Sequence, residues 1–263
     1  MEENKTTIGG LSINYKTFGA KSAKTVLVLH GWGKGSDSWV EVGKMLAKKG
    51  YHAVCPDLPG FGRSDEPKIP WAIADYLKFV QDFCAELKLD GFYLAGHSFG
   101  GGVSAAFVAH NPGIVKKLVL IDSAIARKER LGLRQAAAKI MAGGKELFLK
   151  LPFADKLRPM AEKLVYKIAG AHDYQKTSGI MRQTFKNILG EDLISAADFI
   201  KIPVLIIWGR DDSSTPLEDA FILEKKIPGA KLKIIDGCGH NPHVTHPREL
   251  AGAIDSFLTL NKL

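Results

Sequence analysis

The sequence contains little cysteine and no long hydrophobic run. Its three cysteines, Cys55, Cys84 and Cys238, are an odd number without close spacing, which argues against a disulfide framework and a zinc site. Apolar runs such as residues 26–29 have the length of strands and not of membrane-spanning helices. The first ten residues, MEENKTTIGG, lack the basic and apolar regions of a secretory signal. We therefore expect a cytoplasmic protein with buried, reduced cysteines and no integral membrane association.

Motifs for cofactors and metals are also missing from the sequence. The Gly31-Trp-Gly33 stretch lacks the third glycine of a dinucleotide-binding fingerprint, and the chain has no P-loop lysine motif. His243 and His246 follow His240 closely, but carboxylates at ligand spacing do not accompany them. We therefore expect a protein that needs no cofactor and no metal.

The excess of positive charge is confined to one part of the chain. The formal net charge is +8, and residues 124–201 hold 15 basic and 8 acidic residues. The remainder holds 21 basic and 20 acidic residues and is nearly neutral. Because the charges of this segment alternate with apolar residues, we interpret them as the solvated face of amphipathic helices and expect no nucleic-acid partner. A role as an electrostatic guide for anionic substrates or lipids is the alternative.

The order of the predicted elements indicates the fold. The chain has 263 residues, of which 46% are hydrophobic and 24% charged, as in a globular protein with a sizeable core. Strand and helix patterns alternate up to residue 121, after an opening hairpin at Gly9-Gly10, which predicts a mainly parallel sheet. The predicted strands are residues 6–8, 11–15, 25–30, 52–55, 92–95, 117–121, 203–208 and 231–235. The predicted helices outside the central segment are residues 38–50, 70–87, 103–110 and 247–260.

The central segment breaks this alternation, because only helical patterns occur between about residues 126 and 199. They cover residues 136–141, 146–151, 160–168 and 181–188, and we interpret apolar residues such as Met181 and Phe185 as the core of the segment rather than as pocket lining. We therefore predict an α/β fold with a mostly parallel sheet flanked by helices. Residues 1–124 and 201–263 form its core, and residues 125–200 form an inserted helical lid.

The pentapeptide Gly96-His97-Ser98-Phe99-Gly100 matches the G-x-S-x-G nucleophile elbow. A serine on a tight turn between a strand and a helix is exposed for attack, and the flanking glycines let the two elements approach closely. The amino terminus of the following helix favours negative charge at the site. The pattern alone is weak evidence, but its position between a predicted strand and a predicted helix strengthens the interpretation of Ser98 as a nucleophile.

A serine nucleophile needs a base, and the base needs an orienting acid. His240 follows the last predicted strand and Asp212 follows the strand before it, so both lie where parallel sheets place ligands. The order serine, acid, histidine is the one that accompanies this elbow. Asp211 and Asp122 are rivals for the acid, since Asp122 also lies just beyond a predicted strand.

Four blocks make nearly the whole chain resemble the α/β-hydrolase superfamily. They are HGWG at 30–33, DLPGFGRS at 57–64, GHSFGG at 96–101, and WGRDD at 208–212 together with GHNPH at 239–243. The resemblance implies that fold, assigns the acid to Asp212 and the base to His240, and assigns the oxyanion-hole donors to the backbone N–H groups of Trp32 and Phe99. Many relatives carry glutamate five residues after the histidine, where this chain has Thr245.

We predict a serine esterase that cleaves a carboxylic ester of a small molecule through an acyl-enzyme. The resemblance leaves lactonase, carbon–carbon hydrolase, perhydrolase and thioester hydrolase activity open, although carbon–carbon hydrolases usually carry asparagine where this chain has His97. Relatives that open epoxides or displace halide use an aspartate nucleophile, which Ser98 argues against. A triad-bearing small-molecule receptor with slow turnover is the alternative of a different class. Monomer and homodimer both stay open.

Overall fold

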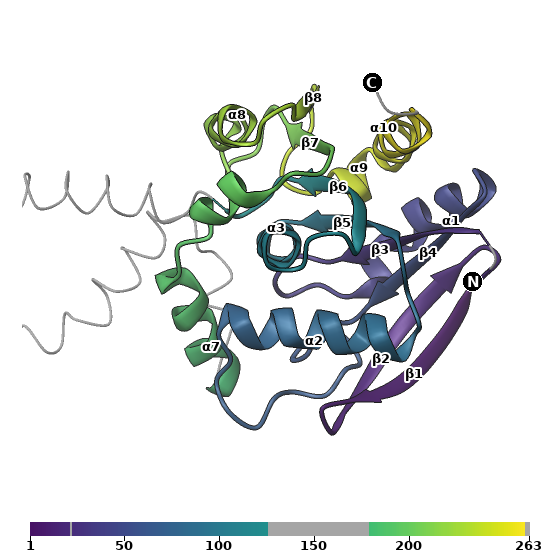
Figure 1. Ribbon diagram of the computed structural model, residues 1–263, viewed down its shortest axis with the longest axis vertical. Coiled ribbons are helices and arrows are strands. Elements are labelled where there is room, and N and C mark those ends of the chain that lie inside the picture. The colour runs from purple at the N-terminus through teal and green to yellow at the C-terminus, as the bar shows by residue number, and fades with distance from the viewer. Residues whose placement is uncertain (22, 126–178, 261–263) are drawn as a thin grey trace, which may run out of the picture.

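Eight strands form one sheet in the computed structural model, which describes residues 1–21, 23–125 and 179–260 (Figure 1). Their order across the sheet is β1-β2-β4-β3-β5-β6-β7-β8, and every neighbouring pair is parallel except β1 with β2 and β2 with β4. The strands are β1 (Glu2–Ile8), β2 (Leu11–Phe18), β3 (Lys24–Leu29), β4 (Tyr51–Pro56), β5 (Phe92–His97), β6 (Val115–Ile121), β7 (Val204–Gly209) and β8 (Lys231–Ile235).

Helices cover both faces of the sheet, so its central strands are apolar on both sides. Alternate residues of β3 belong to different cores: Leu27 and Leu29 lie in one buried cluster, and Val26 and Val28 lie in the other. Helices α2, α3 and α8 pack on the first face, and α1 and α10 pack on the second (Figure 1). The described helices are η1 (Ser36–Trp39), α1 (Val40–Lys48), α2 (Ile73–Glu86), α3 (Phe99–His110), α7 (Gly179–Gly190), η3 (Ile194–Phe199), α8 (Leu217–Lys226), α9 (Pro242–Thr245) and α10 (Pro247–Thr259).

The structure confirms the predicted fold class and all eight predicted strands. The opening hairpin turns at Gly9 and Gly10, whose φ angles of 57° and 79° suit glycine. Helix α3 begins at Phe99, four residues earlier than predicted, because the glycines that weaken helix propensity there are needed for close packing. The sequence patterns missed α8 and the four-residue α9.

The predicted lid falls largely outside the described residues. Its expected helices at 136–141, 146–151 and 160–168 lie there, so the boundaries proposed for core and lid stay predictions. The expected helix at 181–188 is confirmed as α7. It packs beside the start of α2, where the Thr184 hydroxyl accepts a hydrogen bond from the Trp71 amide at 2.9 Å. Within the described part of the chain, no helix has the length and apolar character needed to cross a membrane.

Candidate active site

Ser98 lies on a strained turn between β5 and α3. Its φ of 52° and ψ of −117° fall in a region that residues with a side chain seldom adopt. The flanking glycines permit this turn: a Cβ on Gly96 would collide with the Gly100 carbonyl, and a Cβ on Gly100 would collide with the end of β3. The turn therefore places Ser98 at the carboxyl edge of the parallel strands, with the amino terminus of α3 directly after it.

The structure brings Ser98, His240 and Asp212 into one chain of contacts. The Nε2 atom of His240 lies 3.0 Å from Oγ of Ser98, and its Nδ1 atom lies 2.7 Å from Oδ2 of Asp212. An ionised carboxylate can only accept hydrogen bonds, so we place the imidazole proton on Nδ1. Nε2 is then the unprotonated nitrogen, and it accepts the hydrogen bond of the Ser98 hydroxyl.

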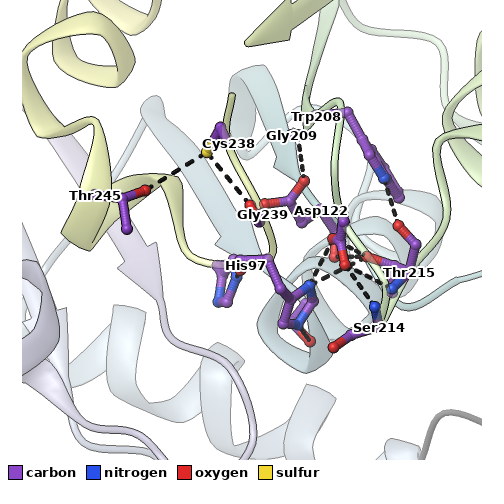
Figure 2. A network of polar contacts seen from close by, with 12 residues as sticks. His97, Asp122, Trp208, Gly209, Ser214, Thr215, Cys238, Gly239 and Thr245 are labelled. Carbon is purple, nitrogen blue, oxygen red and sulfur yellow. Dashed lines mark hydrogen bonds and ion pairs between the residues drawn. The ribbon is translucent and has the colours of Figure 1, made fainter. Parts of the chain in front are cut away.

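Asp212 is held as a carboxylate by hydrogen bonds. Its Oδ1 accepts from the amides of Ser214 at 2.7 Å and Thr215 at 2.9 Å, and its Oδ2 accepts from the Thr215 hydroxyl at 2.6 Å (Figure 2). Burial acts to raise the pKa of Asp212, but the hydrogen bond and charge of His240, together with the Thr215 bonds, outweigh burial and lower it below the ordinary value. The carboxylate is therefore ionised and oriented toward the imidazole.

The two rival aspartates lie in different environments. Asp211 is exposed, whereas Asp122 is completely buried. Oδ1 of Asp122 accepts a hydrogen bond from the Gly209 amide at 2.8 Å, and its buried Oδ2 has no hydrogen-bond partner among the described residues (Figure 2). Burial, and then the nearby charge of Asp212, raise the pKa of Asp122 to about 8. Asp122 is therefore mainly protonated at neutral pH, next to an ionised Asp212.

The two residues expected to supply oxyanion donors lie in chain segments next to Ser98. Phe99 is the first residue of α3, so its amide has no acceptor one turn earlier in that helix. Trp32 follows Gly31, and a Cβ placed on Gly31 would lie 3.2 Å from the Ser98 Cβ. The rings of Trp32 and Phe99 pack edge to face with centroids 5.3 Å apart. Both chain segments are therefore neighbours of the serine.

An apolar recess opens next to these residues. Phe185 of α7 lies in its wall, and it also packs on Trp32 with ring centroids 4.8 Å apart. Phe185, expected in the core of the central segment with pocket lining as the alternative, therefore packs in a buried cluster on one face of the sheet and also lies in a pocket wall. Met181 packs elsewhere, against Gly60. The recess is lined by Trp32, Phe99, Ala124, Ile125, Phe185, Ile188, Leu189, Glu191 and Leu193.

His30 and Asp57 organise the loops around the site. The His30 Nδ1 atom lies 2.8 Å from the Gly31 carbonyl, and its Nε2 atom accepts from the Leu58 amide at 2.9 Å. Burial lowers the pKa of His30, so the ring is neutral. The Asp57 carboxylate accepts from the Arg63 amide at 2.9 Å and from the Asn14 amide group at 2.9 Å. These contacts connect the loop after β4 to the loop that carries Trp32.

One trio of potential metal ligands occurs among the described residues. His97, Asp122 and His240 each offer an atom within 4.8 Å of the others. Both nitrogens of His240 already contact Ser98 and Asp212, and Nε2 of His97 lies 2.7 Å from the His240 carbonyl. A metal would have to break these contacts, so the donor set suits proton transfer better than coordination.

Comparisons with known proteins agree with this architecture. Residues 24–247 match the family described as the alpha/beta hydrolase fold. An uncharacterized protein of Mycobacterium tuberculosis is 28% identical over 261 residues, which cover 91% of this chain and 76% of that protein. The monoacylglycerol lipase ABHD6 of Rattus norvegicus is 28% identical over 253 residues, which cover 89% of this chain and 75% of the lipase.

A solved structure described as a membrane phospholipase A and bacterial virulence factor is also similar. It superposes with a TM-score of 0.73 at 27% sequence identity, and the match covers 98% of this chain and 85% of that one. The family match spans well over half of the sequence. The chain therefore belongs to the alpha/beta hydrolase fold family, a family of hydrolases, and lipases are among its relatives.

Proposed function

We propose that this protein is a serine hydrolase that cleaves carboxylic esters with Ser98 as its nucleophile. The observation that carries the proposal is the continuous contact from Ser98 Oγ through the His240 imidazole to Asp212, with distances of 3.0 Å and 2.7 Å. The left-handed backbone at Ser98 supports it, because such strain persists where the surrounding structure holds a group for function. The lipases among the relatives support an ester as the substrate.

The first half-reaction forms an acyl-enzyme. Oγ of Ser98 attacks the acyl carbon while Nε2 of His240 takes the hydroxyl proton, so the nucleophile is activated as its new bond forms. Asp212 stabilises the resulting imidazolium and keeps the ring in the productive tautomer. His240 then protonates the leaving alkoxide, and the carbon–oxygen bond of the ester breaks.

The second half-reaction releases the acid. A water molecule attacks the acyl carbon while His240 takes a proton from the water. The bond between the acyl carbon and Oγ of Ser98 then breaks, and His240 returns a proton to Oγ, which restores the starting state. Negative charge develops on the carbonyl oxygen in both halves. The backbone N–H groups of Trp32 and Phe99 are the proposed donors to that oxygen, and the loss of one such donor costs about 3 kcal/mol of transition-state stabilisation.

The apolar recess suggests which part of the ester lies beside the oxyanion donors. Trp32 and Phe99 line part of it, and the other lining residues are aliphatic or aromatic, such as Ile125 and Phe185, except for Glu191. An apolar group bound there would remove hydrophobic surface from water, worth about 25 cal/mol per Å². We therefore propose esters that present an apolar acyl group to Ser98.

Hydrolysis of p-nitrophenyl esters tests this function. We expect steady turnover by the wild-type protein and a decrease in kcat on the order of 10⁶-fold for Ser98→Ala, as for a triad serine. Ser104→Ala is the matched control, because this buried serine of α3 donates to the Gly100 carbonyl, one turn beyond the elbow. Its activity should stay close to that of the wild type.

Two outcomes would contradict the proposal. Equal turnover by wild type and Ser98→Ala would remove the nucleophile from the reaction. A burst of product that stops below one equivalent, with product tightly bound, would favour a small-molecule receptor. A series of acyl chains from acetyl upward tests the recess. Because its volume is about 20 Å³, apolar binding predicts that kcat/KM rises over the first added carbons and then levels off.

A further inference from the structure

Three buried rings pack in series next to His240, the first pair stacked and the second pair tilted by 56°. His97 is the last residue of β5, His243 lies in α9 and Trp39 ends η1, and each is only 1% exposed. His243 stacks on Trp39 with centroids 4.8 Å apart and planes 9° apart. His97 packs on His243 at 4.4 Å and on His240 at 4.9 Å. This ring stack (Trp39, His243 and His97) therefore reaches from the second helical face of the sheet to the loop of His240.

The His97 side chain makes one hydrogen bond that ties it to this loop. Its Nε2 atom lies 2.7 Å from the backbone carbonyl of His240. A carbonyl only accepts, so Nε2 must carry the proton. The other nitrogen, Nδ1, is buried and has no hydrogen-bond partner in the described part of the chain. The backbone of His240, the proposed base, is therefore held by a hydrogen bond from the Nε2–H group of His97.

Burial keeps the stack uncharged. Desolvation, and then the neighbouring His243 and His240, hold the pKa of His97 well below its ordinary value. Desolvation, followed by the charge of Lys34, lowers the pKa of His243 to about 3. Neutral rings can pack against one another without charge repulsion. Because His97 stays neutral near pH 7, the proton on its Nε2 atom stays in place there.

His97 also touches the segment that carries Trp32. A Cβ placed on Gly31 would lie 2.8 Å from the His97 Nδ1 atom, so this backbone packs directly on the ring. His97 is covalently joined to Ser98 on its other side. One side chain therefore contacts or adjoins the three segments that carry the proposed nucleophile, base and oxyanion donor.

We propose that His97 is a positioning residue that fixes His240 relative to Ser98, through its hydrogen bond to the His240 carbonyl. This inference rests on the proposed function of the site. Without the bond, the His240 backbone gains freedom, and a displacement of about 1 Å at a reacting group can cost 10²-fold in rate. His97 is not among the residues that line the apolar recess, so its loss should affect kcat and leave KM nearly unchanged.

The matched variants are His97→Gln and His97→Met. The two new side chains have similar length, but only glutamine has an N–H donor for the His240 carbonyl. We expect His97→Met to lower kcat about 10- to 100-fold, because a displacement of about 1 Å at a reacting group can cost up to about 10²-fold, and His97→Gln to recover most of the loss. The rate at which a fluorophosphonate labels Ser98 should change in parallel, since it reports activation of the nucleophile. His52→Met is the control, because His52 also faces a backbone carbonyl, that of Gly19 at 3.3 Å, but lies at the amino end of β4.

The outcomes separate this inference from the proposed function. If wild type shows Ser98-dependent turnover and His97→Met matches it in kcat, the positioning role is wrong and the esterase stands. If His97→Gln loses as much kcat as His97→Met at equal melting temperature, packing and not the hydrogen bond is responsible, which also contradicts the inference. If wild type shows no Ser98-dependent turnover, the proposed function fails and the positioning role fails with it.

Discussion

The loops after β6 and β7 each carry a buried aspartate, and the two carboxyl groups differ in what surrounds them. Asp212, after β7, accepts hydrogen bonds from the amides of Ser214 and Thr215, from the Thr215 hydroxyl and from His240. Asp122, after β6, accepts from the Gly209 amide and leaves one buried oxygen without a partner among the described residues. The first has a lowered pKa, and the second a pKa raised to about 8.

This difference shows that the donors in a loop, and not its place at the sheet edge, decide which carboxyl group ionises. Both aspartates end neighbouring parallel strands. At Asp212, His240 together with the amides and the hydroxyl of its own loop offsets the cost of burying a charge, and Asp122 has no comparable set of donors among the described residues. The neutral Asp122 also spares Asp212 the repulsion of a second buried negative charge at neutral pH.

The largest expected effect comes from exchanging the acid. Asp212→Asn should lower kcat for ester hydrolysis on the order of 10⁴-fold, because the amide cannot hold His240 in the productive tautomer. Asp122→Asn should retain most of the activity, since its carboxyl is already neutral at neutral pH. Steady-state kinetics of the two variants measure the contrast.

Asp211→Asn is the control for this pair, because it makes the same chemical change in the exposed neighbour of Asp212. Comparable losses of kcat for Asp122→Asn and Asp212→Asn would show that both carboxyl groups are needed for turnover, which contradicts the assignment of Asp212 alone as the acid.

A smaller effect is expected on the free energy of unfolding, where replacing Asp122 should stabilise the protein. Its folded pKa of about 8 exceeds its ordinary value of 3.8, so between these values the folded protein holds a proton that the unfolded chain has released. Stability therefore falls as pH rises through this window and levels off above it. Asp122→Asn removes this loss and keeps an acceptor for the Gly209 amide, so its advantage over wild type should grow with pH, by up to a few kcal/mol.

Urea unfolding of both proteins at about pH 5, 7 and 9 measures this difference. An advantage that is the same at every pH would mean that Asp122 ionises normally in the folded protein.

The smallest expected effect concerns the Thr215 hydroxyl, which donates to Asp212 at 2.6 Å. Thr215→Val preserves the side-chain shape and removes the donor, so the pKa of Asp212 should rise and kcat should fall about tenfold, as for the loss of a hydrogen bond to a charged group. Thr215→Ser keeps the hydroxyl and should remain close to wild type. If valine and serine variants have equal kcat, the hydroxyl does not support the acid.

The sequence predicted the centre of the sheet well because strands such as β5 and β7 are nearly continuous apolar runs, buried on both faces. It predicted the start of α3 poorly. Gly100, Gly101 and Gly102 argue against a helix by propensity, yet the approach of β3 and of Ser123 leaves no room for a Cβ at Gly100 or Gly101. Local propensity gives way here to tertiary packing.

For the candidate site, the resemblance to the α/β-hydrolase superfamily distinguished Asp212 from Asp211, and the structure brings Asp212 to His240. Spacing could not reveal the protonated state of Asp122, because it depends on burial of the carboxyl group and on the nearby charge of Asp212 in a distant loop. The contact of His97 with the His240 carbonyl joins residues 143 positions apart. Such contacts depend on how separate loops meet at the sheet edge, and no local pattern encodes them.

Covalent trapping shows whether Ser98 is the nucleophile. The protein is treated with a fluorophosphonate, and the labelled peptide is identified by mass spectrometry. We expect one adduct, on the peptide that contains Ser98, with activity lost in proportion to labelling, and no adduct in Ser98→Ala. Labelling at another residue, or full ester turnover by a protein whose Ser98 stays unmodified, would contradict the account.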